Sequence, residues 1–222
     1  MFEQLEARSL LSAVVNFSDG VTASQSGSGS LVIKMDSKAT KGGSKAGPTS
    51  AAAMNITVIE NGISQTNGGV QIGLGNVLVH DNITGEEMVF FNVKPNKSVQ
   101  IQGGKGDDTI FFQGATLGAD IKGDDGNDMI TVLDAGSASS KIDSGNGDDT
   151  IAIVFSQNAE IKTGNGNDLV LINTSADPNA GTGGYDYDHS NIKVQGQGGS
   201  TTVVVDAGNV KANGGHTQVV NA

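Results

Sequence analysis

The sequence predicts an all-β protein, a right-handed parallel β-helix (solenoid) with coils of about 20 residues and a short N-terminal capping segment. The main observation is a phrase that recurs in four strong copies, IQGGKGDDTIFF, IKGDDGNDMITV, IDSGNGDDTIAI and IKTGNGNDLVLI, starting at Ile101, Ile121, Ile142 and Ile161. Each copy combines an apolar start, a Gly-rich acidic turn and a β-branched run. The second observation is composition: 33 of 222 residues are glycine and only 4% are aromatic, which suits a narrow core of Val, Ile and Leu.

The columns of the repeat predict its strands. Apolar and polar residues alternate within each run, as in a strand that buries one face. One coil cannot bury its apolar face alone, so the coils must stack to form a continuous core. Weaker copies start at Val70, Val194 and Val210, and we expect the first coil at Val70. The apolar column nine residues after each start contains Ile110, Ile130, Ile151, Val170, Val79, Val203 and Val219.

The chain before the repeats has a different character. Residues 1–12 (MFEQLEARSLLS) predict a short amphipathic helix that caps the solenoid, or an export-related segment. Residues 13–69 predict an N-terminal β cap. The stretch 36–53 combines several lysines with Gly, Ser and Ala and predicts a mobile loop. Strands of the cap are expected over 13–17, 30–35 and 55–60.

Residues 70–222 make up the expected solenoid, and two insertions interrupt it. The first insertion, 80–96, should hold an extra strand over 88–93. The second, 174–191, contains both tyrosines of the chain beside acidic residues and a histidine. Aromatic rings beside carboxylates suit sugar stacking or a metal ion, and an ordinary solvated loop is the alternative. The residues of this candidate ligand loop are Tyr185, Asp186, Tyr187, Asp188 and His189.

The end of the last copy bears on self-association. Val219 and Val220 lie close to the last residue, and no polar capping segment follows them. An uncapped solenoid end exposes unpaired backbone and apolar side chains. Three interpretations remain open: an earlier segment folds over this end, the chain is a fragment, or copies associate through the solenoid ends.

The acidic residues of the four strong copies fall into two columns. A regular solenoid stacks the carboxylates of one column about 4.8 Å apart, where neighbours repel by roughly 1 kcal/mol in water. A hard cation between stacked turns would offset this repulsion, because Ca²⁺ takes oxygen ligands at about 2.3–2.6 Å. The preceding column alternates Asp and Asn, so a metal-free hydrogen-bond ladder is the alternative. The columns are Asp108, Asp128, Asp149 and Asp168, and Asp107, Asn127, Asp148 and Asn167.

A family resemblance favours calcium. GGKGDDTIF at 103–111 resembles the nonapeptide G-G-x-G-x-D-x-U-x of repeats-in-toxin (RTX, hemolysin-type) calcium-binding proteins at every fixed position. The other strong copies depart from it at one glycine each, where Asp124, Ser144 and Thr163 stand. The resemblance covers about 101–172. The family packs two nonapeptides per coil, whereas one occurs here, so only one edge could carry ions.

The RTX resemblance implies which residues would serve a calcium site. Aspartate side chains and the carbonyl groups of the turns would supply oxygen ligands. The implied metal residues are Asp107, Asp108, Asp128, Asp148, Asp149 and Asp168. The implied turn residues are Gly103, Gly104, Gly106, Gly123, Gly126, Gly145, Gly147, Gly164 and Gly166.

A second resemblance concerns the N-terminus. Leu5, Glu6, Arg8, Leu10 and Leu11 match the LEPR-XLL motif of large extracellular proteins from planctomycete bacteria, with alanine where that motif has proline. The motif also lies near the N-terminus in that family. It implies a secreted protein or one on the bacterial cell surface.

Composition excludes several classes of partner and site. The net charge of −11 argues against nucleic acid as a main partner. The absence of cysteine excludes disulfides and thiolate metal sites. No apolar run is long enough for a membrane span. Neither G-x-S-x-G nor H-E-x-x-H occurs, and the only arginine, Arg8, lies outside the repeats, so the sequence leans against an enzyme.

Two functions remain open at this point. The first is a non-enzymatic extracellular or surface β-solenoid, stabilised by calcium, with a role in adhesion, matrix or structure. The second is a carbohydrate-active or polysaccharide-binding β-helix whose site lies on the insertion loops. Expected partners are therefore calcium, and either a surface polysaccharide or further copies of the chain.

Overall fold

The computed structural model describes residues 12–35, 53–60, 66–67, 70–71, 75–94, 99–114, 116–133, 139–154, 158–173, 191–205, 210–213 and 216–221. These residues form β-strands and turns, and none of them is helical, so the prediction of an all-β protein is confirmed. Among them, no helix is long and apolar enough to cross a membrane. The segments 1–11, 36–52 and 174–190, which hold the N-terminal motif, most of the expected mobile loop and the candidate ligand loop, lie outside the described residues.

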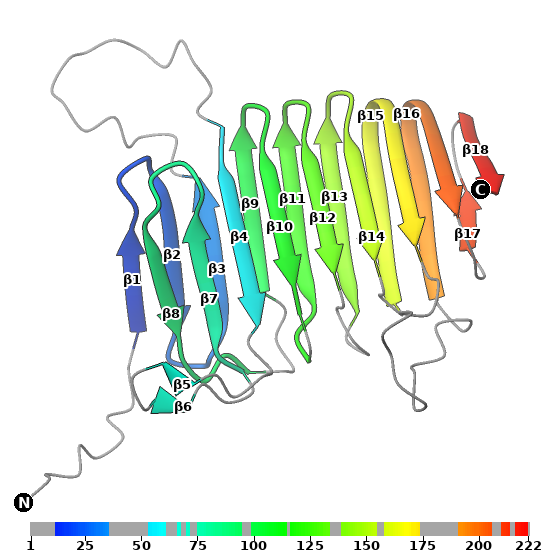
Figure 1. Cartoon of the computed structure of the whole chain (residues 1–222). Helices are drawn as coiled ribbons and strands as arrows, with labels where there is room; N and C mark the ends of the chain where they lie inside the picture. The colour runs from blue at the N-terminus through cyan, green and yellow to red at the C-terminus, as the bar shows by residue number, and fades with distance from the viewer. Residues whose placement is uncertain are drawn as a thin grey trace, which may run out of the picture.

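The strands are labelled in chain order (Figure 1). They are β1 (Ser12–Asn16), β2 (Val21–Ser26), β3 (Leu31–Met35), β4 (Asn55–Glu60), β5 (Thr66–Asn67), β6 (Val70–Gln71), β7 (Val77–Asp81), β8 (Glu87–Phe90), β9 (Val99–Lys105), β10 (Thr109–Gln113), β11 (Ala119–Asp125), β12 (Met129–Leu133), β13 (Ser140–Asn146), β14 (Thr150–Val154), β15 (Asn158–Asn173), β16 (Asn191–Val205), β17 (Val210–Asn213) and β18 (His216–Asn221).

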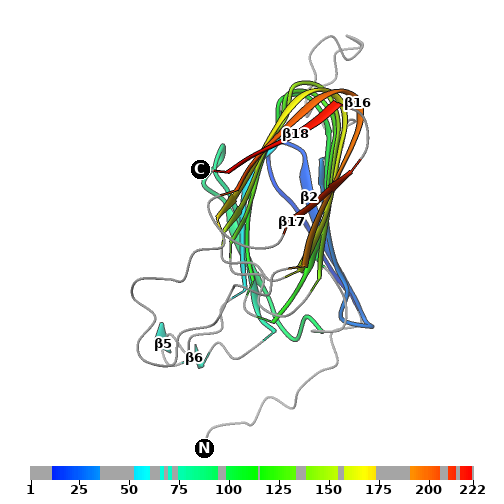
Figure 2. The same cartoon turned by 90° about the vertical axis from the view of Figure 1, so that its right-hand side faces the viewer.

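Most strands belong to one sheet that doubles back on itself. Its path runs β1-β2-β3-β9-β11-β13-β15 and returns through β14-β12-β10-β4-β7-β8, with β16, β17 and β18 joined beyond β15. We call the β9, β11, β13 side, with the first halves of β15 and β16 and with β17, the first layer. The second layer is β4, β10, β12, β14, the second halves of β15 and β16, and β18. Viewed along the stack, the layers face each other and meet at one edge (Figure 2).

Like residues of successive copies pair in parallel. In the first layer Ile121 pairs with Ile101 and with Ile142, and Ile161 pairs with Val194. In the second layer Ile130 pairs with both Ile110 and Ile151. The repeat columns of the four strong copies are therefore the registers of the sheet, and each of these copies contributes one strand to each layer.

The core lies between the two layers. Along β10 and its parallel neighbours, buried and part-exposed residues alternate, as the period of two predicts. Ile110 and Phe112 are fully buried whereas Phe111 is half-buried. The inward columns of both layers supply most of one continuous hydrophobic core, so stacking provides the burial that a single copy lacks.

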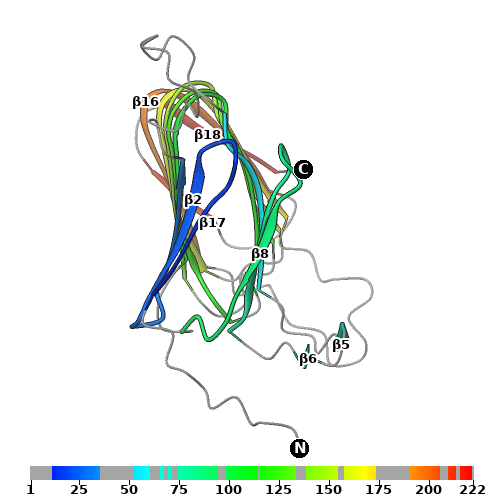
Figure 3. The same cartoon turned by 90° about the vertical axis from the view of Figure 1, so that its left-hand side faces the viewer.

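The N-terminal end of the stack is antiparallel (Figure 3). Strands β1, β2 and β3 form an antiparallel meander, and β3 then pairs in parallel with β9. Strand β4 starts the second layer, because Ile56 pairs in parallel with Ile110. Strand β7 pairs antiparallel with β4, and β8 pairs antiparallel with β7.

One prediction from the repeat is wrong. The copy that starts at Val70 does not form the first coil, because Val70 pairs antiparallel within the two-stranded β5–β6 sheet. Val79 likewise pairs antiparallel with Val58, so it does not belong to the parallel column of Ile110. The cap strands expected over 13–17, 30–35 and 55–60 correspond to β1, β3 and β4, and the strand expected over 88–93 corresponds to β8. Strand β2 was not expected.

Candidate metal centre

The Gly-rich turns join the two layers at one edge. Gly104, Gly145 and Gly164, at the second position of the turn, have φ of +100°, +103° and +72°. Asp124 occupies that position in the remaining copy with φ of +73°, a conformation that aspartate tolerates better than most residues. The turn therefore keeps its shape in the copy that departs from the glycine pattern.

A second glycine column allows the turns to stack closely. Gly126, Gly147 and Gly166 also have positive φ, between +130° and +140°. A Cβ on Gly126 would lie 2.0 Å from the carbonyl oxygen of Gly106, and a Cβ on Gly147 would lie 2.0 Å from that of Gly126. Any side chain at these positions would collide with the backbone of the preceding turn, so the stack itself requires glycine here.

The sixth-position aspartates form a buried ladder inside these turns. Asp108, Asp128, Asp149 and Asp168 are each between 1% and 3% exposed. The backbone N–H of Asp108 donates to Oδ1 of Asp128 at 2.8 Å, and that of Asp128 donates to Oδ1 of Asp149 at 2.9 Å. The N–H of Asp149 donates to Asp168 Oδ1 at 3.2 Å, and Met54 N–H donates to Asp108 Oδ1 at 2.6 Å. Asp128, Asp149 and Asp168 thus each bind the turn before them, and Asp108 binds the residue before β4.

The other oxygen of each carboxylate has no partner. Oδ2 of Asp108, Asp128, Asp149 and Asp168 is buried and makes no hydrogen bond to any described residue. A Cβ on Gly103 would lie 2.0 Å from Asp108 Oδ2, so this glycine makes room for the unpartnered oxygen. Unsatisfied buried carboxylate oxygens are costly, because nothing replaces the water that they lose.

Ser144 and Thr163 stand where the first two strong copies have Gly103 and Gly123. Both side chains are fully buried. The Ser144 hydroxyl donates to the carbonyl oxygen of Thr163 at 2.9 Å, and the hydroxyls of Thr163 and Thr201 lie 2.8 Å apart. These two departures from the RTX pattern therefore continue a polar column through the turn interior.

Burial raises the pKa of the inner aspartates above the ordinary value of 3.8. The pKa of Asp108 rises to about 7 and that of Asp128 to about 6. The backbone donors lower each pKa, but burial outweighs them, and the charges of Asp124 and of neighbouring ladder members raise it further. The site therefore favours a proton or a cation over free negative charge.

The outer acidic column is a hydrogen-bond ladder with exposed side chains. The N–H of Asn127 donates to Oδ1 of Asp107 at 2.8 Å, and the N–H of Asp148 donates to Oδ1 of Asn127 at 2.8 Å. The N–H of Asn167 donates to Asp148 Oδ1 at 2.7 Å. This ladder runs in the opposite direction to the inner one and needs no metal for its hydrogen bonds.

The residues of the inner ladder suit a hard cation. Their free donors are carboxylate oxygens, which Ca²⁺ prefers, and they are buried where an uncompensated charge is unfavourable. Within the described residues, no three Asp, Glu, His or Cys side chains converge on one point. An ion here would thus be shared between stacked turns and completed by their carbonyl oxygens. The structure brings the inner four predicted metal residues into one column and leaves Asp107 and Asp148 on the outside.

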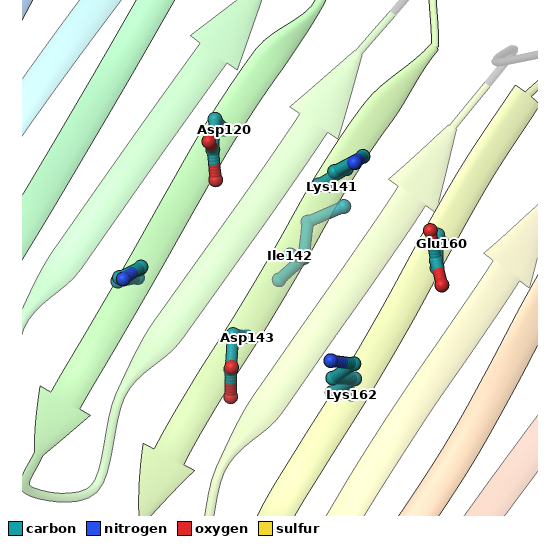
Figure 4. Close-up of a pocket in the computed structure, with 7 residues that line it drawn as sticks. Asp120, Lys141, Ile142, Asp143, Glu160 and Lys162 are labelled. Carbon is teal, nitrogen blue, oxygen red and sulfur yellow. The ribbon is translucent and has the colours of Figure 1, made fainter.

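The structure also brings charged residues of the first layer together on its outer face. A shallow depression lies on the outer face of the first layer (Figure 4). Lys141 pairs across the sheet with Asp120 and Glu160, and Asp143 pairs with Lys122 and Lys162, so positive and negative residues alternate in both directions. This alternation of charges depends on which strands are neighbours, so the linear sequence does not show it.

Glu60 was missed in the sequence, although it is a buried anchor. It is 3% exposed and accepts hydrogen bonds from the backbone N–H groups of Thr116 and Leu117 at 2.6 and 2.8 Å. Its role follows from a loop 56 residues away, so no local pattern could have found it.

Comparison with known proteins does not assign the chain to a family. No protein-family model, no curated protein and no solved structure matches it.

Proposed function

We propose that the chain is a non-enzymatic, calcium-stabilised structural element, a right-handed parallel β-helix of an extracellular or cell-surface protein. The parallel registers of both layers support the β-helix, and the general preference for right-handed crossovers supports its hand. An adhesion or matrix role fits a rigid stack whose function is to hold its shape.

One observation carries the calcium proposal: the column of four buried carboxylates that each keep one oxygen without a partner. A plain ladder would satisfy both oxygens or place the second one in water. The outer column does the latter, because Asp107 and Asp148 are exposed. The contrast between the two columns favours a cation in the inner one.

The mechanism would be linkage between ion binding and folding. The inner aspartates come together only when the turns stack, so an ion bound by them adds free energy to the stacked state alone. Calcium would supply positive charge and a ligand sphere that accepts several oxygens. Asp108, Asp128, Asp149 and Asp168 would hold it together with turn carbonyl groups.

Burial of these aspartates also favours a structural role over catalysis. Side chains that are at most 3% exposed cannot reach a bond in a polymeric substrate. Export to a calcium-rich medium would then coincide with completion of the fold, which agrees with the LEPR-XLL resemblance.

Isothermal titration of chelator-treated protein with calcium tests this proposal. We expect saturable binding, and Asp128→Asn should weaken it roughly tenfold or more because it removes a ligand charge from the middle of the column. Asp107→Asn is the matched control, since it makes the same change in the exposed outer column. Absence of binding to folded protein, or an equal loss in both variants, would contradict the proposal.

A further inference from the structure

The outward positions of the second layer hold no Asp, Glu, Lys or Arg among the residues that the structure describes. We call this the uncharged face: the outward positions of β4, β10, β12, β14, the second halves of β15 and β16, and β18. They are occupied by Thr, Asn, Gln, Ala and large apolar residues, with His216 at the start of β18. Met129, Leu171 and Val220 are 53%, 39% and 40% exposed.

The contrast with the other layer makes this composition informative. The outward face of the first layer alternates lysine with aspartate or glutamate over β11, β13 and β15. The same stack therefore presents one charged and one uncharged surface, although the net charge of the chain is −11. Exposed apolar side chains that gather on a face without ionic residues are typical of an interaction site.

We propose that the uncharged face pairs with the same face of a second copy of this chain. Two copies with a charge of −11 repel each other, and contact through this face opposes no charged side chains of the described strands. The cores of homodimer interfaces are depleted in charged residues and rich in apolar ones. A two-fold axis would bring the same patch of each copy together, with the layers packed as in a β-sandwich.

The size of the face agrees with a modest dimer. Seven strands about 4.8 Å apart, each contributing five residues that rise about 3.3 Å, span roughly 500 Å². Two such faces bury about 1,000 Å² in total, which is the lower limit for a specific interface. We therefore expect association at micromolar to millimolar concentration. The proposal does not depend on calcium binding.

Sedimentation velocity of the full chain over this concentration range, with calcium and with chelator, is the test. We expect a monomer–dimer equilibrium whose dissociation constant rises at least about tenfold in Leu171→Asp, because the change places two charges in the interface. Val14→Asp is the matched control. Val14 is 62% exposed on β1, outside the uncharged face, and its replacement should leave the equilibrium unchanged.

A second variant guards against a folding defect. Thr131→Lys lies on a different strand of the same face and should weaken the dimer as Leu171→Asp does, with circular dichroism confirming that both variants are folded. Mixing the two variants should bring back part of the association, because a mixed pair carries one negative and one positive charge in the interface instead of two like charges. A chain that stays monomeric throughout, or a dimer that neither variant weakens, would overturn the proposal. So would a monomer whose face instead binds a hydrophobic dye, since another molecule would then be its occupant.

Discussion

The two oxygens of each inner aspartate have different surroundings. Oδ1 of Asp128 accepts the backbone N–H of Asp108 and so ties one turn to the next. Oδ2 of the same residue has no such partner, and burial raises the pKa of the carboxyl to about 6. Without a cation, the proton is the remaining means of neutralising this group. Calcium and protons should therefore compete for the column.

This competition predicts a pH dependence with a definite sign. The folded-state pKa values of Asp108 and Asp128, about 7 and about 6, lie above the ordinary 3.8, so the folded protein binds these protons more tightly than the unfolded chain. Their contribution to stability is complete below about pH 4 and is lost as pH rises through 6 and 7. Metal-free protein should thus show a lower urea midpoint at about pH 8 than at about pH 5.

Two further measurements check the origin of that trend. Asp128→Asn should shrink the difference between the two pH values, because the amide does not titrate. With calcium present, the stabilisation by the ion should be larger at the higher pH, where the carboxylates are ionised. If the urea midpoint of the chelated protein instead rises with pH, the pKa values of the inner aspartates are not raised by burial as described.

At the scale of the turn, glycine is required by stacking as well as by backbone conformation. Gly147 has φ of +130°, and its hydrogen position faces the carbonyl oxygen of Gly126 in the turn before it. Gly85, in the turn between β7 and β8, also has positive φ, at +73°, but nothing lies within 4 Å of the place where a Cβ would be. Gly147 is therefore required by both its backbone conformation and close stacking, whereas Gly85 is required by its backbone conformation alone.

Gly147 and Gly85 therefore offer a matched pair of alanine substitutions that tests the close packing of the turns. Gly147→Ala should lower the free energy of unfolding by about 3 kcal/mol or more, because it adds a collision with backbone to the cost of positive φ. Gly85→Ala should cost only about 1 kcal/mol, since it bears the conformational cost alone. Urea unfolding of both variants measures the difference. Equal losses would mean that the turns are not packed as closely as described.

At the scale of the whole molecule, the sequence repeat predicts the strand pairing in one part of the sheet and not in another. The columns of Ile101 and Ile110 predicted the parallel registers correctly, because residues at one position of a repeat must stack when each copy adds one turn. The copy at Val70 has the same apolar ends and central glycine, yet its strands pair antiparallel. Local alternation indicates a strand but not the direction of its neighbour, so most strands of the N-terminal end could be predicted but their antiparallel pairing could not.

The candidate metal centre could also be predicted only in part from the sequence. The aspartate column was visible in the sequence, whereas the difference between a buried inner column and an exposed outer one was not. That difference depends on which side of the turn Asp107 and Asp108 occupy, and adjacent residues point to opposite sides. The uncharged face was hidden for a similar reason, since it is assembled from alternate residues of seven strands.

The central claim is that calcium completes the stack, and the most direct measurement is thermal unfolding of chelated protein by circular dichroism as calcium is added. We predict that the β signal and the melting temperature rise with calcium, and that Asp128→Asn and Asp149→Asn reduce the rise. A chelated protein that is already fully folded, with a melting temperature that calcium does not change, would contradict the claim. The aspartate column would then be a structural ladder without a metal.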